Sequence, residues 1–361
     1  MTDLRAGPRA DPRTDLRTDL RADLRADLRV GILLPTREQA ITGGFAAAPL
    51  LDFARRAEDL GFDSLWAGDS LTARPRLDPL IILAAAGAVT SRITLGTAAL
   101  TAALRHPLLG AHMVASLDHV GASRLILGLG GGFPLPETEE EFGAVGADFA
   151  TRVGRLDETA ALWRHAWNST RDGAPEDFEG RYWQARGLHR LPPPYRPGGP
   201  PLWLAGSDTP KVLRRVARHY DGWLPFVPSA GQYEKAWQQI GTELEEAGRP
   251  AGAVTPALYA TLTVDPDREG ARRELDHYLR HYYGRSLEQM APLQAYGWGG
   301  AEECAAWLAG YVRAGARHLV LRIGSFDPRP HLEEIAATVL PALRALLKPG
   351  SAASTTTSHL Q

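Results

Sequence analysis

The chain has 361 residues, of which 44% are hydrophobic, and its formal net charge is −2 at pH 7. This size permits one large or two medium domains, and the near-neutral charge gives no electrostatic basis for binding nucleic acid or an anionic membrane surface. The single cysteine, Cys304, excludes an intramolecular disulfide framework and a thiolate metal cluster within one chain, so we expect a cytoplasmic protein.

The two ends of the chain are expected to be disordered. Residues 1–28 repeat a four-residue unit, which in a helix would stack aspartate on aspartate and arginine on arginine. A Leu-striped interaction helix is the alternative, but one thin stripe buries little apolar surface. The tail, 348–361, is rich in Ser, Thr and Ala. The sequence also contains no apolar stretch long enough for a membrane helix.

Between these ends, over 29–347, short apolar runs alternate with amphipathic stretches, which is typical of parallel strands separated by helices. The expected strands are Val30–Leu34, Asp63–Ala67, one beginning at Ile93–Leu95, Leu125–Leu129, Leu202–Ala205, Gly222–Phe226, Ala257–Val264 and His318–Ile323. The expected helices are Leu50–Leu60, Leu80–Val89, Leu108–Val120, Phe149–Trp167, Pro210–His219, Gln232–Ala247, a helix from Asp265–Pro266 to Tyr283, Ala301–Ala314 and His331–Leu347. Eight such units predict an α/β fold, a closed (β/α)8 TIM barrel, with an open doubly wound sheet as the alternative.

Two long irregular stretches interrupt this pattern, Asn168–Pro201 and Gly284–Gly300. A loop as long as the first is unusual in a compact domain unless it is a lid or a substrate-binding insertion. We therefore expect loop insertions in the barrel.

Three consecutive glycines, Gly130, Gly131 and Gly132, follow the fourth strand. Glycines at this place free backbone N–H groups to face an anion or a flat ring, so they are candidates for cofactor binding. A tight turn that binds nothing is the alternative.

A second candidate site follows the fifth strand, at Gly206, Ser207 and Thr209. Backbone N–H groups and two hydroxyls converge there on the start of a helix, which suits a phosphate. The alternative is that Ser207 or Thr209 only caps the helix.

Eight motifs, in this order, resemble the bacterial luciferase-like family of flavin- or F420-dependent oxidoreductases. They are Phe62–Ser70, Leu95–Ala98, Leu104–Pro107, Ser123–Phe133, Phe178–Tyr182, Pro201–Ser207, Asp221–Trp223 and Ala314–His318. The resemblance implies a (β/α)8 barrel that holds reduced FMN or F420 at the carboxyl ends of its strands, with the coenzyme phosphate near Ser207. It also implies a non-prolyl cis peptide that supports the ring, and the matching dipeptide is Thr97–Ala98.

Asp69 and His106 are the candidates for proton handling. Asp69 directly follows the second strand, so its carboxylate is expected in the barrel mouth, and loop capping is the alternative. His106 stands at a helix N-terminus, which favours the neutral imidazole, and fixing the turn before Pro107 is the alternative. Many F420-using members of the family have His after this Asp, whereas this chain has Ser70.

The loop after the second strand also carries Arg74 and Arg76. They are candidates for contact with an anionic substrate or the F420 tail, although solvated loop charge is the simpler interpretation. Several aromatic side chains are candidates for an apolar substrate pocket, namely Trp66, Phe133, Tyr182, Trp183 and Trp223.

These features predict a monooxygenase that uses reduced FMN and O₂ on a small organic substrate. The alternatives are an F420-dependent reductase or dehydrogenase that transfers a hydride, and a non-catalytic flavin-binding subunit. A separate flavin reductase and a second copy of the chain are candidate partners. No sequence pattern indicates a metal site or an acyl hydrolase.

Overall fold

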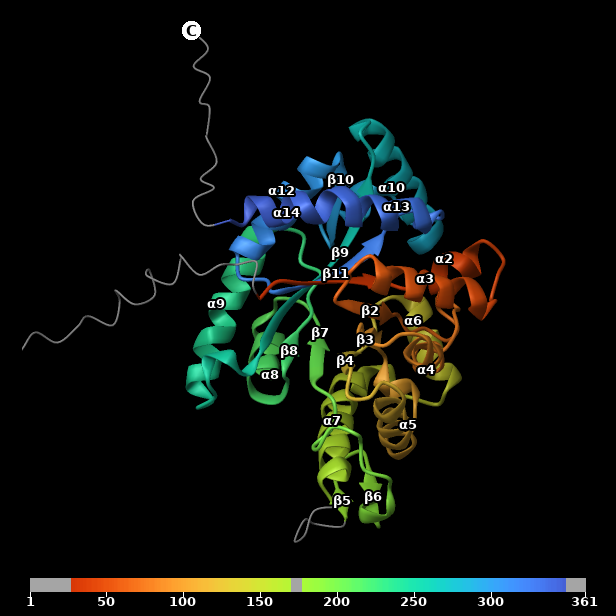
Figure 1. Ribbon diagram of the computed structural model, residues 1–361. Coiled ribbons are helices and arrows are strands. Elements are labelled where there is room, and N and C mark those ends of the chain that lie inside the picture. The colour runs from red at the N-terminus through yellow and green to blue at the C-terminus, as the bar shows by residue number, and fades with distance from the viewer. Residues whose placement is uncertain (1–26, 170–176, 349–361) are drawn as a thin grey trace, which may run out of the picture.

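The computed structural model describes residues 27–169 and 177–348, and among them eight parallel strands close into a barrel (Figure 1). The strands are β1 (Arg29–Leu33), β2 (Ser64–Ala67), β3 (Thr94–Leu100), β4 (Leu125–Gly130), β7 (Leu202–Ala205), β8 (Gly222–Trp223), β9 (Thr255–Val264) and β11 (His318–Ile323). Pairing of β8 with β9 and of β11 with β1 completes the ring. The predicted TIM barrel is confirmed, and the open sheet is excluded.

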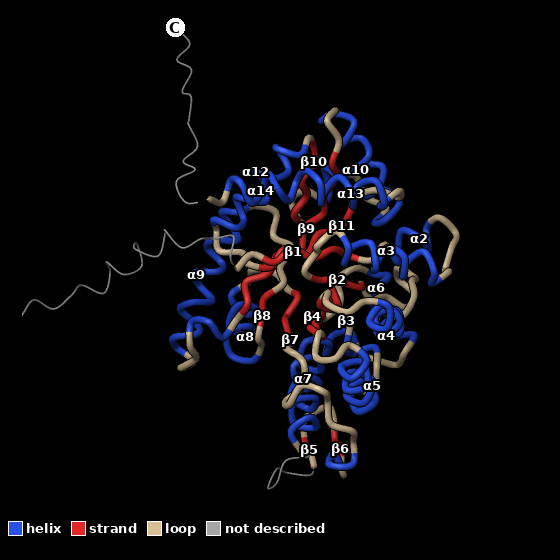
Figure 2. Tube along the Cα trace, in the orientation of Figure 1, coloured by secondary structure: helices blue, strands red, loops and turns tan. Residues whose placement is uncertain are grey.

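The helices cover the outside of the barrel (Figure 2). They are α2 (Thr36–Ile41), α3 (Ala47–Asp59), α4 (Pro79–Val89), α5 (Pro107–Val120), α6 (Pro136–Ala144), α7 (Arg152–Asn168), α8 (Pro210–His219), α9 (Ala230–Glu246), α10 (Arg268–Tyr283), α11 (Leu287–Met290), α12 (Ala301–Arg313), α13 (Pro328–Glu334) and α14 (Leu340–Leu346). Between α13 and α14 the chain forms a π-helical stretch, Ile335–Val339, within the region predicted as one helix.

Two tryptophans fill the amino-terminal half of the barrel interior. The rings of Trp66 and Trp203 lie 5.4 Å apart, and both meet the edge of His318. Glycines on neighbouring strands make room for them, since a Cβ on Gly96 would lie 2.3 Å from the Trp66 ring. Burial lowers the pKa of His318 to about 3, so its imidazole is neutral where it meets the Ser64 hydroxyl.

The start of α4 has the predicted aspartate cap, whereas the start of α10 differs from the prediction. The Asp78 carboxylate accepts hydrogen bonds from the amides of Leu80 and Ile81, as expected for a cap followed by proline. In contrast, α10 is capped by Asp267, whereas Asp265 accepts from the Asp267 amide. The predicted start at Asp265–Pro266 is therefore wrong, because the capping carboxylate is that of Asp267, two residues later.

Both irregular stretches contain short elements that the pattern did not predict. In 284–300 the chain forms α11 and β10 (Ala295–Gly299), which pairs with β9 outside the closed ring. In 168–201 it forms an antiparallel pair, β5 (Phe178–Glu179) and β6 (Gln184–Ala185), seen beside the end of α7 in Figure 1. The short helices α2 and α6 are further additions.

The described part of the first insertion packs against α5 and α7. The Glu158 carboxylate of α7 accepts from the amides of residues 181–183, and the Trp183 ring lies 5.6 Å from His106, which precedes α5. These contacts fix the insertion on the outer helices, and its role as a lid stays a prediction.

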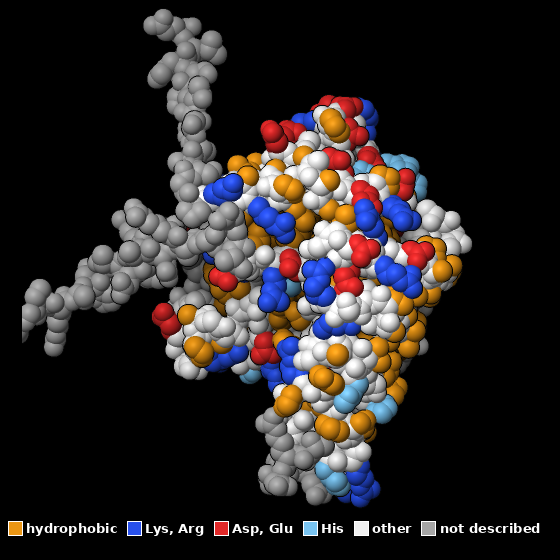
Figure 3. All heavy atoms as spheres, in the orientation of Figure 1, with side chains coloured by type: hydrophobic (Ala, Val, Ile, Leu, Met, Phe, Trp, Pro, Cys, Tyr) orange, Lys and Arg blue, Asp and Glu red, His pale blue; other side chains and the backbone are white. Residues whose placement is uncertain are grey.

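The expected disordered ends lie almost entirely outside the described residues, which begin at residue 27 and end at residue 348. Within the described part, Figure 3 shows acidic and basic side chains interspersed on the visible face. None of the helices in the described ranges is long and apolar enough to cross a membrane.

Candidate active site

The carboxyl ends of the strands form the mouth of the barrel, which is where enzymes of this architecture place their chemistry. The alternation that turns Trp66 and Trp203 inward also turns small residues inward nearer the mouth. These residues are Gly68, Ala98, Gly130 and Ala205. Ala98, Gly130 and Ala205 are partly exposed although they point inward, so the mouth is open on this side. The facing strands, β9 and β11, instead contribute Tyr259, Thr261 and Arg322.

Asp69 lies at the mouth as predicted, but it is held in an ion pair. Its side chain is 4% exposed. It accepts hydrogen bonds from both terminal guanidinium nitrogens of Arg105, at 2.6 Å and 3.1 Å, and from the Thr101 amide at 3.0 Å. Arg105 also binds Asp78, at 2.6 Å. Burial raises the pKa of Asp69, and the hydrogen bond and charge of Arg105 oppose that shift. The arrangement makes Asp69 an anchor for the segment after β3.

His106 is exposed, directly before α5, and its side chain does not cap that helix. The motif Leu104–Pro107 therefore contributes Arg105, and not His106, to the contacts of Asp69. A proton-handling role for His106 stays a prediction.

The cis peptide bond is present, but it joins Ala98 and Ala99, one bond later than the predicted Thr97–Ala98. This bond lies within a bulge in β3. Between the pairs Thr97–Leu127 and Leu100–Leu129, β3 has two residues where β4 has one. The Thr97 hydroxyl donates to the Gly128 carbonyl at 2.9 Å and so ties the two strands together beside the bulge.

The glycines after β4 have roles within the chain itself. A Cβ on Gly130 would lie 3.1 Å from that of Ala99, so this glycine admits the bulge. Gly132 has a φ of +83°, and a Cβ there would lie 3.0 Å from Phe142. Gly131 has only ordinary contacts. Cofactor binding by these three glycines stays a prediction.

Ser207 and Thr209 come together at the start of α8. Their hydroxyl oxygens lie 3.3 Å apart, and neither residue is buried. Thr209 occupies the N-cap position without a side-chain capping hydrogen bond, which argues against the interpretation as a simple cap. Gly206 allows the tight turn, since a Cβ there would lie 2.8 Å from Val212.

These residues fit a coenzyme with a flat ring and a phosphate. Small, partly exposed side chains line one side of the mouth, and two hydroxyls without a capping role stand at a helix N-terminus. Among the residues in the described ranges, no group of His, Cys, Asp and Glu side chains has the arrangement of a metal site.

Sequence reasoning missed Arg105, Arg37 and Arg322. Arg322 stands within a buried strand, and an arginine in an otherwise apolar run was the available signal. Arg74 and Arg76 were interpreted as solvated loop charge, and that interpretation is wrong. The Arg74 side chain is 12% exposed and pairs with Glu137, whereas Arg76 donates to the Tyr282 hydroxyl at 3.1 Å.

Glu141 of α6 explains why the loop after β2 has a fixed shape. Its carboxylate accepts from the Ser70 hydroxyl at 2.8 Å and from the amides of residues 71–73. This one buried acid therefore positions the loop that carries Arg74 and Arg76.

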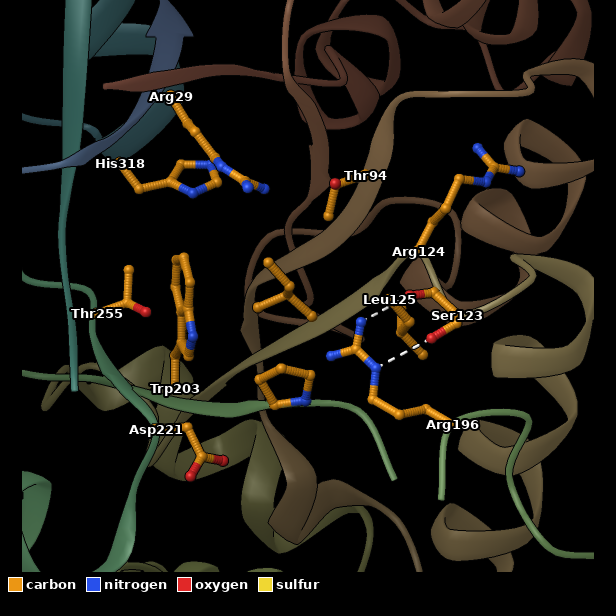
Figure 4. Close-up of a pocket in the computed structure, with 12 residues that line it drawn as sticks. Arg29, Thr94, Ser123, Arg124, Leu125, Arg196, Trp203, Asp221, Thr255 and His318 are labelled. Carbon is orange, nitrogen blue, oxygen red and sulfur yellow. Dashed lines mark hydrogen bonds between the residues drawn. The ribbon is translucent and has the colours of Figure 1, made fainter. Parts of the chain in front are cut away.

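A cavity of about 430 Å³ lies at the opposite, amino-terminal end of the barrel (Figure 4). Its lining includes Arg29, His318 and Trp203, and Arg196 donates from Nε to the Ser123 hydroxyl at 3.0 Å. None of the predicted site residues lines it. In this architecture the amino-terminal face contributes to stability, so the mouth is the candidate active site.

Comparisons with known proteins place the chain among F420- and FMN-dependent enzymes of similar fold. An F420-dependent glucose-6-phosphate dehydrogenase from Kineococcus radiotolerans is 31% identical over 333 residues, which cover 83% of this chain and 94% of that protein. The solved structure of an F420-dependent secondary alcohol dehydrogenase, in complex with an F420–acetone adduct, has a TM-score of 0.72 at 18% identity and covers 88% of this chain and 99% of its own. The oxygenating constituent of 3,6-diketocamphane monooxygenase from Pseudomonas putida, in complex with FMN, has a TM-score of 0.67 at 18% identity, with coverages of 87% and 98%.

The family model for luciferase-like monooxygenases matches residues 28–318, which is most of the chain. The predicted resemblance is thus confirmed, as is the predicted barrel. The chain belongs to the luciferase-like monooxygenase family and is an enzyme of the oxidoreductase type.

Proposed function

We propose that the protein is an F420-dependent dehydrogenase or reductase that transfers a hydride to or from a small organic substrate. The observation that carries the proposal is the 31% identity to an F420-dependent dehydrogenase along nearly the whole of that relative. The sequence-based prediction preferred reduced FMN and O₂, so this proposal exchanges the first candidate and the alternative. When bound, F420 supplies a carbon centre that exchanges a hydride with the substrate.

The residues at the mouth suit this task. Ser207, Thr209 and the N-terminus of α8 would hold the coenzyme phosphate. Ala98, Gly130 and Ala205 would leave room for the ring. The ion pair of Asp69 with Arg105 would keep the segment after β3 in place beside the cis peptide.

The second candidate is the monooxygenase with reduced FMN and O₂, and Ser70 favours it because many F420-using members have His there. In this structure the Ser70 hydroxyl donates to Glu141 and accepts from the Arg74 amide, so it serves the loop. The two functions differ in their need for oxygen, which an experiment can control.

Anaerobic turnover distinguishes the two candidates. With F420 and an alcohol or glucose 6-phosphate in the absence of O₂, we expect the visible absorbance of oxidised F420 to fall. Consumption of O₂ with reduced FMN, together with no change in F420, would reject the proposal in favour of the monooxygenase.

The phosphate site gives a prediction of its own. Changing Ser207→Ala and Thr209→Val together should weaken coenzyme binding about a hundredfold or more, because two hydrogen bonds to a charged group, each contributing about 1.5–3 kcal/mol, are removed. Thermal stability should be unchanged, since neither side chain is buried or caps α8. Fluorescence titration measures the affinity, with Ser116→Ala on the exposed face of α5 as the control. Equal affinity in the double variant and the control would place the phosphate elsewhere.

A further inference from the structure

Four arginines gather in one sector of the barrel mouth. Arg37 follows β1, Arg74 and Arg76 follow β2, and Arg322 lies near the carboxyl end of β11, and these three strands are neighbours in the sheet. The end of α10 joins them there through Tyr282 and Tyr283. Two elements that are far apart in sequence, the loop after β2 and α10, thus share this sector with β11.

The two tyrosines link the guanidinium groups. Arg76 donates to the Tyr282 hydroxyl at 3.1 Å, and Arg322 donates to the Tyr283 hydroxyl at 2.7 Å. The Arg322 guanidinium also lies 4.6 Å from the centre of the Tyr282 ring, and that of Arg74 lies 5.3 Å from the Tyr283 ring. The cluster is therefore a single structure and not a set of separate surface charges.

The positive charge of this cluster is only partly neutralised. Among the ion pairs of the residues in the described ranges, one includes Arg74 and none includes Arg37, Arg76 or Arg322. Glu38, which accepts from the Tyr278 hydroxyl, acts at a distance as a counter-charge to Arg37 and Arg76, whereas Glu141 accepts from loop amides. Burial lowers the pKa of Arg37, and the charges of Arg76 and Arg74 add to that effect, whereas Tyr282 and Glu38 oppose it. Guanidinium groups with few counter-charges are costly to bury, so this sector favours an added anion.

The cluster also has unused hydrogen-bond donors. Nη2 of Arg322, Nε of Arg37 and Nε of Arg74 are buried without a partner, and so is the hydroxyl of Thr36. Arg322 is only 1% exposed. Buried polar groups are nearly always paired, so several unpaired donors in one sector indicate a ligand that accepts hydrogen bonds.

We propose that Arg37, Arg76 and Arg322 bind a phosphate or carboxylate group of the organic substrate. This inference rests on the proposed function and adds the class of substrate, a small anionic molecule. The topology supports the assignment to substrate, because β7, which Ser207 follows, lies across the ring from β1. A coenzyme with its phosphate at Ser207 would leave the arginine sector for the second reactant.

The test uses the full chain without coenzyme and measures binding of inorganic phosphate, and of glucose 6-phosphate against glucose, by calorimetry at constant ionic strength. We expect both anions to bind saturably and glucose not to bind. Arg37→Gln and Arg322→Gln should each weaken binding of the anions about tenfold or more, because a hydrogen bond to a charged group is lost. Arg218→Gln, an exposed arginine of α8, is the control and should bind like the wild type.

Arg322→Gln is the riskier variant because its side chain is buried, so circular dichroism must show that it folds. If it does not fold, the partly exposed Arg37 carries the test, and Arg322→Lys should retain part of the affinity because it keeps the charge without the planar fork. Absence of saturable binding, or equal binding by Arg37→Gln and the control, would overturn the proposal. The unpaired donors would then be hydrogen-bonded to water.

A second arm identifies the source of the anion. Saturating F420 should leave phosphate binding intact, and Arg37→Gln should leave F420 binding intact. Competition between F420 and phosphate would overturn the assignment to substrate and place the coenzyme's own acidic groups in this sector. Failure of F420 to bind at all, with phosphate binding retained, would instead count against the proposed function alone.

Discussion

Replacement of Arg105 by methionine is expected to lower the free energy of unfolding by about 3–5 kcal/mol, the usual effect of removing one partner of a buried ion pair. Arg105 is 16% exposed at its side chain and Asp69 only 4%. Methionine fills similar space without the charge, so the Asp69 carboxylate would keep the Thr101 amide and lose both guanidinium contacts. Urea unfolding at pH 7 measures the loss.

The control is Arg218→Met on α8, where an exposed side chain should change stability by about 0.5 kcal/mol or less. The deficit of Arg105→Met should also depend on pH. Without Arg105, only the Thr101 amide opposes the rise that burial causes in the pKa of Asp69, so the folded state takes up a proton more readily than the unfolded chain. The deficit is therefore largest at neutral pH and becomes smaller as the pH falls toward the ordinary range of aspartate. A deficit no larger than that of the control would show that Asp69 does not depend on this pair.

Gly128→Ala should destabilise the barrel by about 1–3 kcal/mol or more, which is the usual cost of overpacking a core. A Cβ at this position would lie 2.2 Å from the Thr97 carbonyl oxygen, which is backbone. Thr97 has little freedom to withdraw because its own hydroxyl binds the Gly128 carbonyl and the bulge with the cis peptide follows it directly.

The matched control is Gly241→Ala in the interior of α9, where an added Cβ meets nothing within 4 Å. Alanine there should stabilise the helix by about 0.5–1 kcal/mol, so the two substitutions should have opposite signs. Coenzyme affinity is the second readout, since movement of the bulge would disturb the ring site. A Gly128→Ala protein as stable as the wild type would mean that β3 and β4 are less closely joined than the structure indicates.

The barrel was predictable because its strands are short, continuous apolar runs with clear ends. His318–Ile323 matches β11 residue for residue, and Leu202–Ala205 matches β7. The strand predicted at Gly222–Phe226 forms as β8 but ends after two residues, at Trp223. The short strand β10 was not predictable, because it lies within a run containing several glycines and depends on pairing with β9, which no local pattern reveals.

The site was predictable in its place and less so in its contacts. Asp69 and Ser207 both lie at the carboxyl ends of strands, as the strand boundaries required. The partner of Asp69 is Arg105, 36 positions away, and only the path of the loop after β3 brings them together. The cis peptide lies one bond from its expected place, within a bulge of β3 that sequence spacing does not record.

Titration of the purified full chain with F420 and, separately, with FMN tests the central claim, that the open mouth binds a deazaflavin coenzyme. The account predicts saturable binding of F420, weakened by the Ser207→Ala and Thr209→Val double variant, and no comparable binding of FMN. Tight binding of FMN with none of F420 would contradict it.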